Sequence, residues 1–202
     1  MSAKNLYLAS RSVRRRQLLK QIAVKFSCRA AAVDETVLDG DKPAVYVERL
    51  AIEKAQDVAG SVGQGNSAVL AADTAVVLGG RIFGKPANRE DAREMLRALS
   101  GKGHQVFTAV AMSVDGKTDT RLSVSEVMIR PLSDALIERY WQTGEPAGKA
   151  GGYAIQGYAA GFIESLTGSY SGVMGLPLCE TVDLLEQAGI GWALRHGPVN
   201  RA

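Results

Sequence analysis

Apolar residues recur along the chain at two alternating spacings, which is typical of a protein that mixes strands with helices. The first apolar run covers residues 6–9. The apolar residues that follow share one helical face, namely Leu18, Leu19 and Ile22. Residues 24–33 can form a second strand, and a helical spacing then continues from Pro43 to about Ala59. The N-terminal end is therefore predicted to be strand, helix, strand and helix.

Long strands joined by tight turns are predicted in the middle of the chain. Residues 68–78 are apolar apart from Asp73 and Thr74, and the glycine pair that follows predicts a hairpin to a short returning strand. Strands at 104–114 and 118–129 meet at an Asp-Gly pair, which is a strong hairpin signal. Because hairpins alternate with helices, we expect an α/β fold with a mixed sheet.

The remaining elements are shorter. Helices are predicted to begin after Asn88, after Ser133 and at Leu176, because an apolar helical face follows each of these positions. A short strand is expected at 162–166. Residues 148–161 are rich in glycine, and we expect them to form an open segment.

Composition narrows the classes of protein. The 202 residues suffice for one domain, or at most two lobes around a shared cleft, and the 46% hydrophobic content is ordinary for a globular chain. No run of about 18 apolar residues occurs, so no membrane span is expected. Two cysteines exclude a disulfide scaffold and suit a reducing, cytoplasmic environment, while two histidines exclude a multi-histidine metal site. Any metal would be a hard cation held by carboxylates and phosphates.

Charge is distributed unevenly along the chain. Residues 1–30 hold eight lysines or arginines and no acid, although the net charge of the whole chain is only +3. Such a segment could be an organellar leader, a nucleic-acid patch or a site for a small phosphorylated ligand. The strand-to-helix pattern in this segment disfavours a leader.

The arginines at positions 14–16 lie near the first turn of the predicted helix. A helix N-terminus already carries partial positive charge, so three cations there are unfavourable by roughly 0.3–1 kcal/mol each. A bound anion would resolve this conflict through backbone N–H groups and guanidinium groups. Three solvated arginines on a surface helix are the alternative.

Several isolated polar residues could carry chemistry, and each also has a purely structural explanation. Asp73 interrupts an apolar strand, where an acid must be paired, metal-bound or placed at the strand's mouth, although a loop-capping carboxylate explains it equally well. Glu35 follows a strand, where surface acids are common. Lys54 lies on an apolar helical face, where a snorkelling lysine is usual. Lys85 could be a solvated turn lysine, and Gln156 a buried amide held by backbone.

Taken together, these residue types suit the hydrolysis of a phosphoanhydride by positioning and charge neutralisation. The cations able to hold phosphate oxygens are Arg14, Arg15, Lys54 and Lys85. The acids able to hold Mg²⁺ or Mn²⁺, or to activate water, are Glu35 and Asp73. The groups able to pair with the edge of a base are Thr74 and Gln156. There is no Walker A motif and no Ser/His/Asp pattern, and the lone His104 is better explained as structural.

Spaced motifs over about residues 5–188 resemble the Maf family of nucleoside triphosphate pyrophosphatases. They are Leu8-Ala9-Ser10-Arg11-Ser12-Val13-Arg14-Arg15, Leu50-Ala51 with Lys54-Ala55, Ala72-Asp73-Thr74, Gly84-Lys85-Pro86, Leu99-Ser100-Gly101 with His104, Lys149-Ala150-Gly151 with Tyr153, Ile155-Gln156-Gly157 and Gly175-Leu176-Pro177. Each motif is weak alone, but eight in the family's order are highly specific. Departures such as Val13 in place of the family's proline bear on fine substrate preference rather than on the reaction.

The resemblance implies a single domain over residues 1–202, with two lobes around a central cleft and a fold related to the inosine triphosphate pyrophosphatases. It implies metal-dependent hydrolysis between the α- and β-phosphates, which releases a nucleoside monophosphate and pyrophosphate. Asp73 matches the family's proton acceptor, and Glu35 matches a second acid beside the metal. The residues that match phosphate binders are Ser10, Arg14, Arg15, Lys54 and Lys85. A homodimer is also implied.

The family has branches with different substrates. The residue types at Arg14, Thr74 and Gln156 match the branch that acts on dTTP and UTP, with modified pyrimidine nucleotides included in a house-cleaning role. We therefore expect a hydrolase with these nucleotides as partners and without nucleic acid or membrane partners. The alternatives are the 7-methyl-GTP branch and a non-catalytic nucleotide or nucleic-acid binding module centred on residues 1–30. The 21 acidic residues and the lack of aromatics among the arginines disfavour the binding module.

Overall fold

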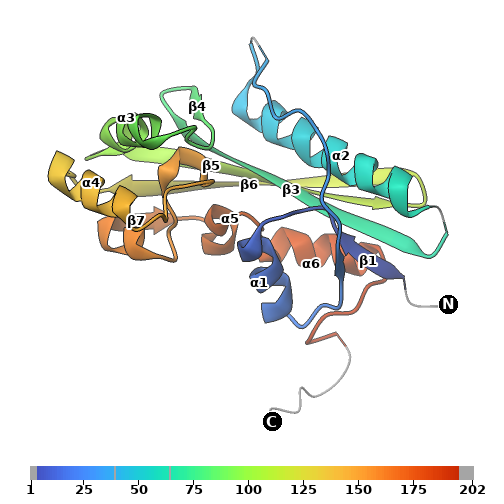
Figure 1. Ribbon diagram of the computed structural model, residues 1–202. Helices are drawn as coiled ribbons and strands as arrows, with labels where there is room; N and C mark the ends of the chain where they lie inside the picture. The colour runs from blue at the N-terminus through green and yellow to red at the C-terminus, as the bar shows by residue number, and fades with distance from the viewer. Residues whose placement is uncertain (1–3, 39, 64, 196–202) are drawn as a thin grey trace.

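The computed structural model describes residues 4–38, 40–63 and 65–195. Within these residues one seven-stranded sheet runs in the order β2-β1-β3-β5-β6-β7, with β4 paired to β3 outside this path (Figure 1). β1 is parallel to β2 and β3, and the other pairs are antiparallel, so the mixed α/β sheet is confirmed. The strands are Asn5–Leu8 (β1), Ser27–Cys28 (β2), Ser67–Leu78 (β3), Arg81–Phe83 (β4), Gly103–Val114 (β5), Lys117–Ile129 (β6) and Ile163–Thr167 (β7).

The three long strands β3, β5 and β6 form the centre of the sheet, and they follow the sequence prediction within a residue or two. The β5–β6 hairpin turns at Asp115 and Gly116, whose φ angles of 50° and 79° are both positive. Such angles match the right-handed twist of paired strands, and Asp-Gly is a favoured pair for them. The turn therefore has the geometry that its sequence indicates.

β3 is buried on both faces, which explains why its sequence is almost continuously apolar. Ala68, Leu70 and Ala72 belong to one apolar cluster, whereas Val69 and Ala71 belong to another. Successive side chains of a strand point to opposite faces, so the two clusters lie on opposite faces of the sheet.

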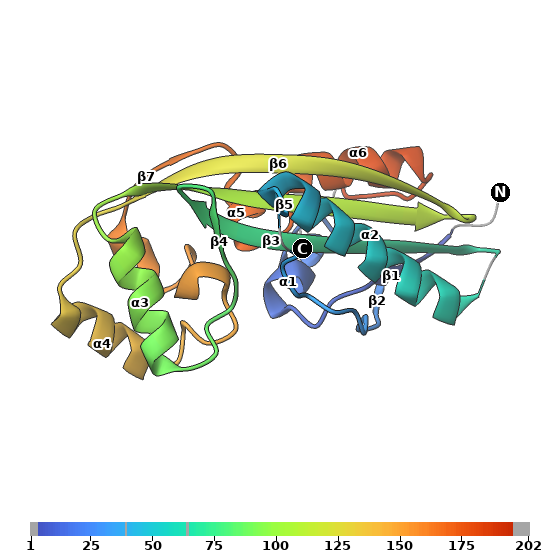
Figure 2. The ribbon, with the colours of Figure 1, turned by 90° about the horizontal axis from the view of Figure 1, so that it is seen from above.

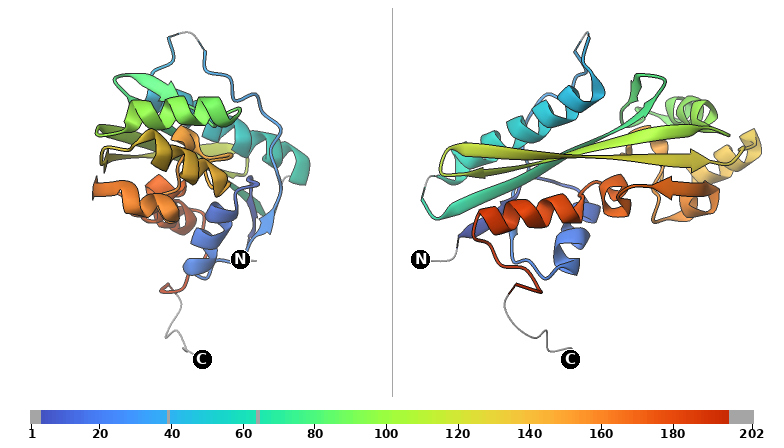
Figure 3. Two further views of the ribbon diagram at one scale, coloured as in Figure 1. Left: turned by 60° about the vertical axis from the view of Figure 1, so that its left-hand side comes forward. Right: turned by 180° about the vertical axis from the view of Figure 1, so that it is seen from behind.

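Helices cover both faces and one end of this sheet. α2 packs on β3 and β5 over one face, and α1 and α6 belong to the apolar cluster of the other face (Figure 3). α3 and α4 pack together at the far end of the long strands (Figure 2). The helices are Val13–Gln21 (α1), Pro43–Val62 (α2), Arg89–Leu99 (α3), Asp134–Gln142 (α4), Tyr170–Met174 (α5) and Leu178–Gln187 (α6). In the part of the chain that the structure describes, no helix is long and apolar enough to cross a bilayer.

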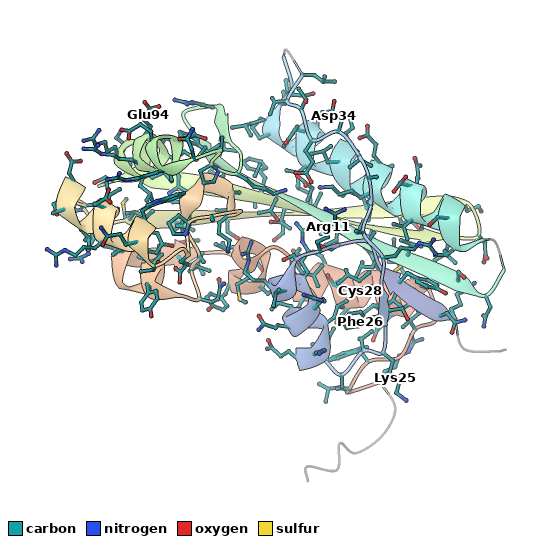
Figure 4. The ribbon with its side chains drawn as sticks, viewed as in Figure 1. Arg11, Lys25, Phe26, Cys28, Asp34 and Glu94 are labelled. Atoms are coloured by element: carbon teal, nitrogen blue, oxygen red, sulfur yellow. The ribbon has the colours of Figure 1, made fainter. Side chains whose placement is uncertain are left out.

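The strand expected at 24–33 is wrong for most of its length. Only Ser27–Cys28 pairs with β1, and both residues are exposed. The rest of the segment crosses from the α1 side of the sheet to the start of α2, and Figure 4 labels Lys25, Phe26, Cys28 and Asp34 along this path. Because the segment passes from one side of the sheet to the other, its packed apolar residues belong to different clusters, Phe26 to one and Ala31 to the other, instead of following one ladder.

Two expectations for the C-terminal third are also corrected. The segment 148–161 is not open, because it forms the 3₁₀ turns Ala150–Gly152 (η1) and Tyr158–Phe162 (η2) and buries Tyr153 and Ile155 between them. The sequence pattern does not predict the short helix α5, and the last helix begins at Leu178 rather than Leu176.

Candidate active site

The edge of β3 is open between two of its partners. β1 pairs with β3 as far as Leu70, and β4 pairs with it from Val76 onward. Among the described strands, residues 71–75 therefore have only β5 as a neighbour. A cavity of about 710 Å³ lies at this gap, and its volume is in the usual range for small-molecule sites.

The gap gives the cavity access to both faces of β3. Asp73 alternates with Ala71 and Ala75 toward α2, while Thr74 points to the opposite face with Ala72. Both Asp73 and Thr74 line the cavity. A strand paired with residues 71–75 would close this edge and separate the two faces of β3. The interruption therefore allows Asp73 and Thr74 to line the same cavity.

A chain of alternating charges connects Asp73 to the solvent. The Lys54 Nζ lies 2.6 Å from Asp73 Oδ1 and 2.6 Å from Glu35 Oε1. The Lys85 Nζ lies 2.5 Å from Glu35 Oε2. The four residues come from β3, α2, the crossing segment and the turn after β4, and the structure brings all four together as the resemblance implies.

Burial separates the roles of the two lysines. Lys54 is only 7% exposed, so it is not a snorkelling lysine, whereas the Lys85 side chain is 57% exposed. Burial of Glu35 works against its ionisation, but hydrogen bonds and charge from Lys54 and Lys85 outweigh burial and lower the pKa of Glu35 to about 2. The Tyr46 hydroxyl donates to the Glu35 backbone oxygen over 2.9 Å and fixes the segment that carries it.

α1 begins at Val13 with a serine cap. The Ser12 hydroxyl accepts from the Arg15 N–H over 3.4 Å, so valine in place of the family's proline leaves the helix start capped. Ser10, which is 9% exposed, lies directly before this cap and lines the cavity. The first turn of α1 therefore faces the cavity.

Arg15 is tied to three separate segments. Its Nε donates to the Gly175 carbonyl over 2.7 Å, its Nη1 to Ser10 Oγ over 3.4 Å and its Nη2 to Thr74 Oγ1 over 3.2 Å. Arg14 donates from Nε to the Met174 carbonyl over 3.2 Å. Burial, and for Arg14 the neighbouring Arg15, lowers the pKa of both guanidinium groups. Two adjacent, partly buried cations that contact no carboxylate within the described residues favour a bound anion over the alternative of solvated surface arginines.

The Thr74 hydroxyl is already engaged within the protein. It lies 3.1 Å from the Thr108 hydroxyl, and Thr108 Oγ1 lies 2.8 Å from the Gly172 carbonyl. A hydroxyl has one proton, so if Thr108 donates to Gly172, then Thr74 must donate to Thr108. The Thr74 oxygen then accepts from Arg15, which makes Thr74 an orienting partner of that arginine.

The segment between η1 and η2 forms another wall of the cavity. Gln156 is exposed there, and within the described residues its side chain makes no hydrogen bond, so it is not the buried amide of the structural explanation. His104 is structural, as expected: it is 3% exposed, and its Nε2 lies 2.8 Å from the Tyr153 hydroxyl. Burial lowers the pKa of His104 to about 4, so the ring is neutral at pH 7.

Two contributors are not evident as site residues from the sequence. Tyr46 belongs to the apolar face of α2 and has the pattern of a core residue, and only its position one turn before Leu50 and two before Lys54 links it to the site. Lys149 lines the cavity, and burial together with the charge of Arg14 lowers its pKa. Lys149 is the first residue of the Lys-Ala-Gly motif, and that motif is the feature of the sequence that could have identified it as a site residue.

The acidic groups suit a small divalent cation. No cluster of three or more His, Cys, Asp or Glu side chains within the described ranges could hold a metal by itself. Asp73 and Glu35 nevertheless share one ammonium at hydrogen-bond distance, so they can also share a cation. Mg²⁺ typically takes one or two protein carboxylates and completes its shell with water and substrate phosphates.

Comparisons with known proteins show which family of sequences the chain is similar to. Residues 5–188 match the family model described as "Maf-like protein". A "dTTP/UTP pyrophosphatase" of Nitrosomonas europaea is 51% identical over 92% of this chain and 95% of its own length. Another, of Alkalilimnicola ehrlichii, is 50% identical over 95% of this chain and 96% of its own.

A solved structure shows a more distant likeness. It is "The structure of the Staphylococcus aureus Ham1 protein", with a TM-score of 0.45, 20% identity, and coverage of 62% of this chain and 72% of that one. The family model and the relatives both extend over nearly the whole chain. The chain belongs to the Maf family.

Proposed function

We propose that this protein hydrolyses dTTP and UTP to the nucleoside monophosphate and pyrophosphate. The observation that carries the proposal is the gap in the β3 edge, where Asp73, the cations and the exposed Gln156 side chain line one cavity. Relatives at about half identity are named dTTP/UTP pyrophosphatases, which supports the same substrates.

The triphosphate would lie between the two groups of cations. All four cations line the cavity: Arg14 lies near Arg15 and Lys149, and Lys85 contacts Glu35. Charge builds up on phosphate oxygens as a phosphoanhydride breaks, and fixed cations stabilise that charge without reorganising. The Ser10 hydroxyl, beside the start of α1, completes the phosphate cradle.

Asp73 is proposed to accept the proton of the attacking water. Lys54 holds Asp73 Oδ1, and within the described part of the chain no donor contacts Oδ2, which leaves that oxygen for the water. Asp73 and Glu35 are also proposed to hold Mg²⁺ or Mn²⁺ together with the substrate phosphates. When bound, such a cation neutralises phosphate charge and lowers the pKa of coordinated water.

Gln156 is proposed to recognise the pyrimidine. A carboxamide offers one acceptor and one donor group side by side, which complements the N3–H and O4 of thymine or uracil. Cytosine presents the opposite pattern at these positions, so binding it with the amide in the same orientation would leave polar groups unpaired. The contacts with Thr108 and Arg15 use the Thr74 proton and one of its two lone pairs, which leaves a single acceptor position for a base edge, so we assign discrimination mainly to Gln156.

The test is pyrophosphate release from dTTP, UTP, CTP, dCTP, GTP and 7-methyl-GTP with Mg²⁺ or Mn²⁺. We expect the parent to release pyrophosphate from dTTP and UTP. Asp73→Asn should lose this activity, while its circular dichroism spectrum should show that the fold is retained. Preference for 7-methyl-GTP would refute the proposed base recognition. If no nucleotide releases pyrophosphate and the protein binds DNA or RNA in a salt-sensitive way, the result would support the binding module instead.

A further inference from the structure

The position of Gln156, the side chain proposed to recognise the base, depends on the residues around it. Gln156 is exposed, and its amide makes no hydrogen bond within the described residues. It lies outside the sheet, between two short 3₁₀ turns. Its direction into the cavity must therefore be set by the backbone on either side of it.

That backbone is held by one pair of side chains, Tyr140 and Glu145. Before Gln156, the Ala154 N–H donates to the Tyr140 hydroxyl over 3.2 Å. After it, the Tyr158 N–H donates to Glu145 Oε2 over 2.9 Å, and the Ala159 N–H donates to Oε1 over 3.2 Å. The pair therefore braces the turn on both sides of Gln156.

The two members of the pair also fix each other. The Tyr140 hydroxyl donates to Glu145 Oε1 over 2.7 Å. Tyr140 is 2% exposed, and its ring packs edge-to-face on Phe162 with centroids 5.1 Å apart. Burial and the neighbouring carboxylate raise the pKa of Tyr140 well above its usual value, so it remains a donor throughout the physiological range.

Gly157 is the point where the segment closes on the carboxylate. A Cβ added at Gly157 would overlap the Glu145 carboxylate group, whose Oε1, Oε2 and Cδ all lie too close to accommodate it. A Cβ added at Gly161, four residues later, would have no atom within 4 Å. The sequence thus uses glycine at 157 for close approach, and any side chain there must push Glu145 away.

We infer that Tyr140 and Glu145 are positioning residues for base selection: they hold the turn around Gln156 so that its side chain reaches the base edge from a fixed backbone position. This inference rests on the proposed function. A residue that only stabilised the fold would affect all substrates alike. The brace should instead alter the ratio between nucleotides that differ only at the edge read by Gln156.

The experiment compares kcat/KM for UTP and CTP in the intact protein and in Tyr140→Phe, Gly157→Ala, Gly161→Ala and Gln156→Ala. Tyr140→Phe and Gly157→Ala both retain the negative charge of Glu145, which interacts with Arg14 and which a substitution of Glu145 itself would remove. Losing one positioning hydrogen bond should reduce the UTP preference about three- to tenfold, mainly through a higher KM for UTP. The matched control Gly161→Ala should keep the parental preference.

The outcomes separate the two proposals. If the parent does not release pyrophosphate from UTP, the proposed function fails and takes this inference with it. If the parent prefers UTP and Gln156→Ala loses that preference, but Tyr140→Phe and Gly157→Ala keep it, only the inference is overturned. Equal losses of kcat/KM on both nucleotides in the two brace variants would also overturn it, since that is the signature of a structural role.

Discussion

The charge chain at the cavity makes a quantitative prediction for Lys54→Met. Lys54 and Asp73 have side chains that are only 9% and 10% exposed, so the pair is largely removed from water. Methionine keeps most of the volume of the lysine stem and leaves little cavity. The substitution therefore measures the loss of the ammonium group alone. That loss leaves the carboxylates of Asp73 and Glu35 without the cation they share.

The expected cost follows from this burial. Breaking a buried ion pair by removing one partner typically costs about 3–5 kcal/mol. Glu35 is 39% exposed and keeps Lys85, and the charge of Arg15 partly compensates Asp73, so we expect about 3 kcal/mol, at the lower end of that range. For a chain of this size the melting temperature should fall by about 6–12 °C. Lys85→Met is the matched control, because an exposed pair contributes less than about 1 kcal/mol.

Thermal and urea unfolding followed by circular dichroism measure both variants. A second test adds Asp73→Asn to Lys54→Met, which removes the abandoned charge and should recover part of the lost stability. If Lys54→Met is as stable as Lys85→Met, the buried pair is not the stabilising feature we take it to be. If the double variant is the less stable one, Asp73 does not suffer from losing its cation.

Three further predictions concern other parts of the site. The pKa of His104 is about 4 when folded against an ordinary value near 6.5, so protons bind the unfolded chain preferentially, and this residue should remove about 3 kcal/mol of stability as pH drops from 6.5 to 4. Urea titrations should show a steep fall in the parent and a shallower one in His104→Gln, where carboxylates with lowered pKa such as Glu35 still contribute. Arg15→Lys loses the fork that joins three segments and should cost about 1.5–3 kcal/mol in urea unfolding, whereas Arg16→Lys should be neutral. A chelator should stop pyrophosphate release without lowering the melting temperature, because Asp73 and Glu35 keep their lysine partners; a large drop on chelation would show a structural metal instead.

Local patterns in the sequence predict the elements that local physics controls. The hairpin at Asp115-Gly116, proline at the first position of α2 and the helix starts after Asn88 and Ser133 all occur as expected. The pattern around Cys28 predicts a strand wrongly, because apolar residues that support a crossing segment look like those of a ladder. Helix α5 spans five residues in a Gly- and Ser-rich stretch, too short for a helical period to be visible.

The site itself depends on register, which local patterns do not contain. Lys54 follows Val47, Leu50 and Ala51 on the buried face of α2, so its spacing indicates burial, but not its two carboxylate partners. The gap opposite Asp73 exists because β1 stops pairing at Leu70 and β4 starts at Val76. In the sequence, only the family's order of motifs indicates that these residues belong to one site. The structure shows the strand gap that brings them together.

The continuity of β3 has a mechanical consequence. β3, β5 and β6 run uninterrupted past the cavity, from the end covered by α6 to the end covered by α3 and α4. Bringing the two ends closer would mean bending the hydrogen-bonded ladders that these strands share. Movement of one end relative to the other must therefore flex this common sheet, because these strands pass through the centre without a linker between the ends. The pocket is stiff along the strands, and adaptation to different ligands falls to the non-sheet segments at its rim.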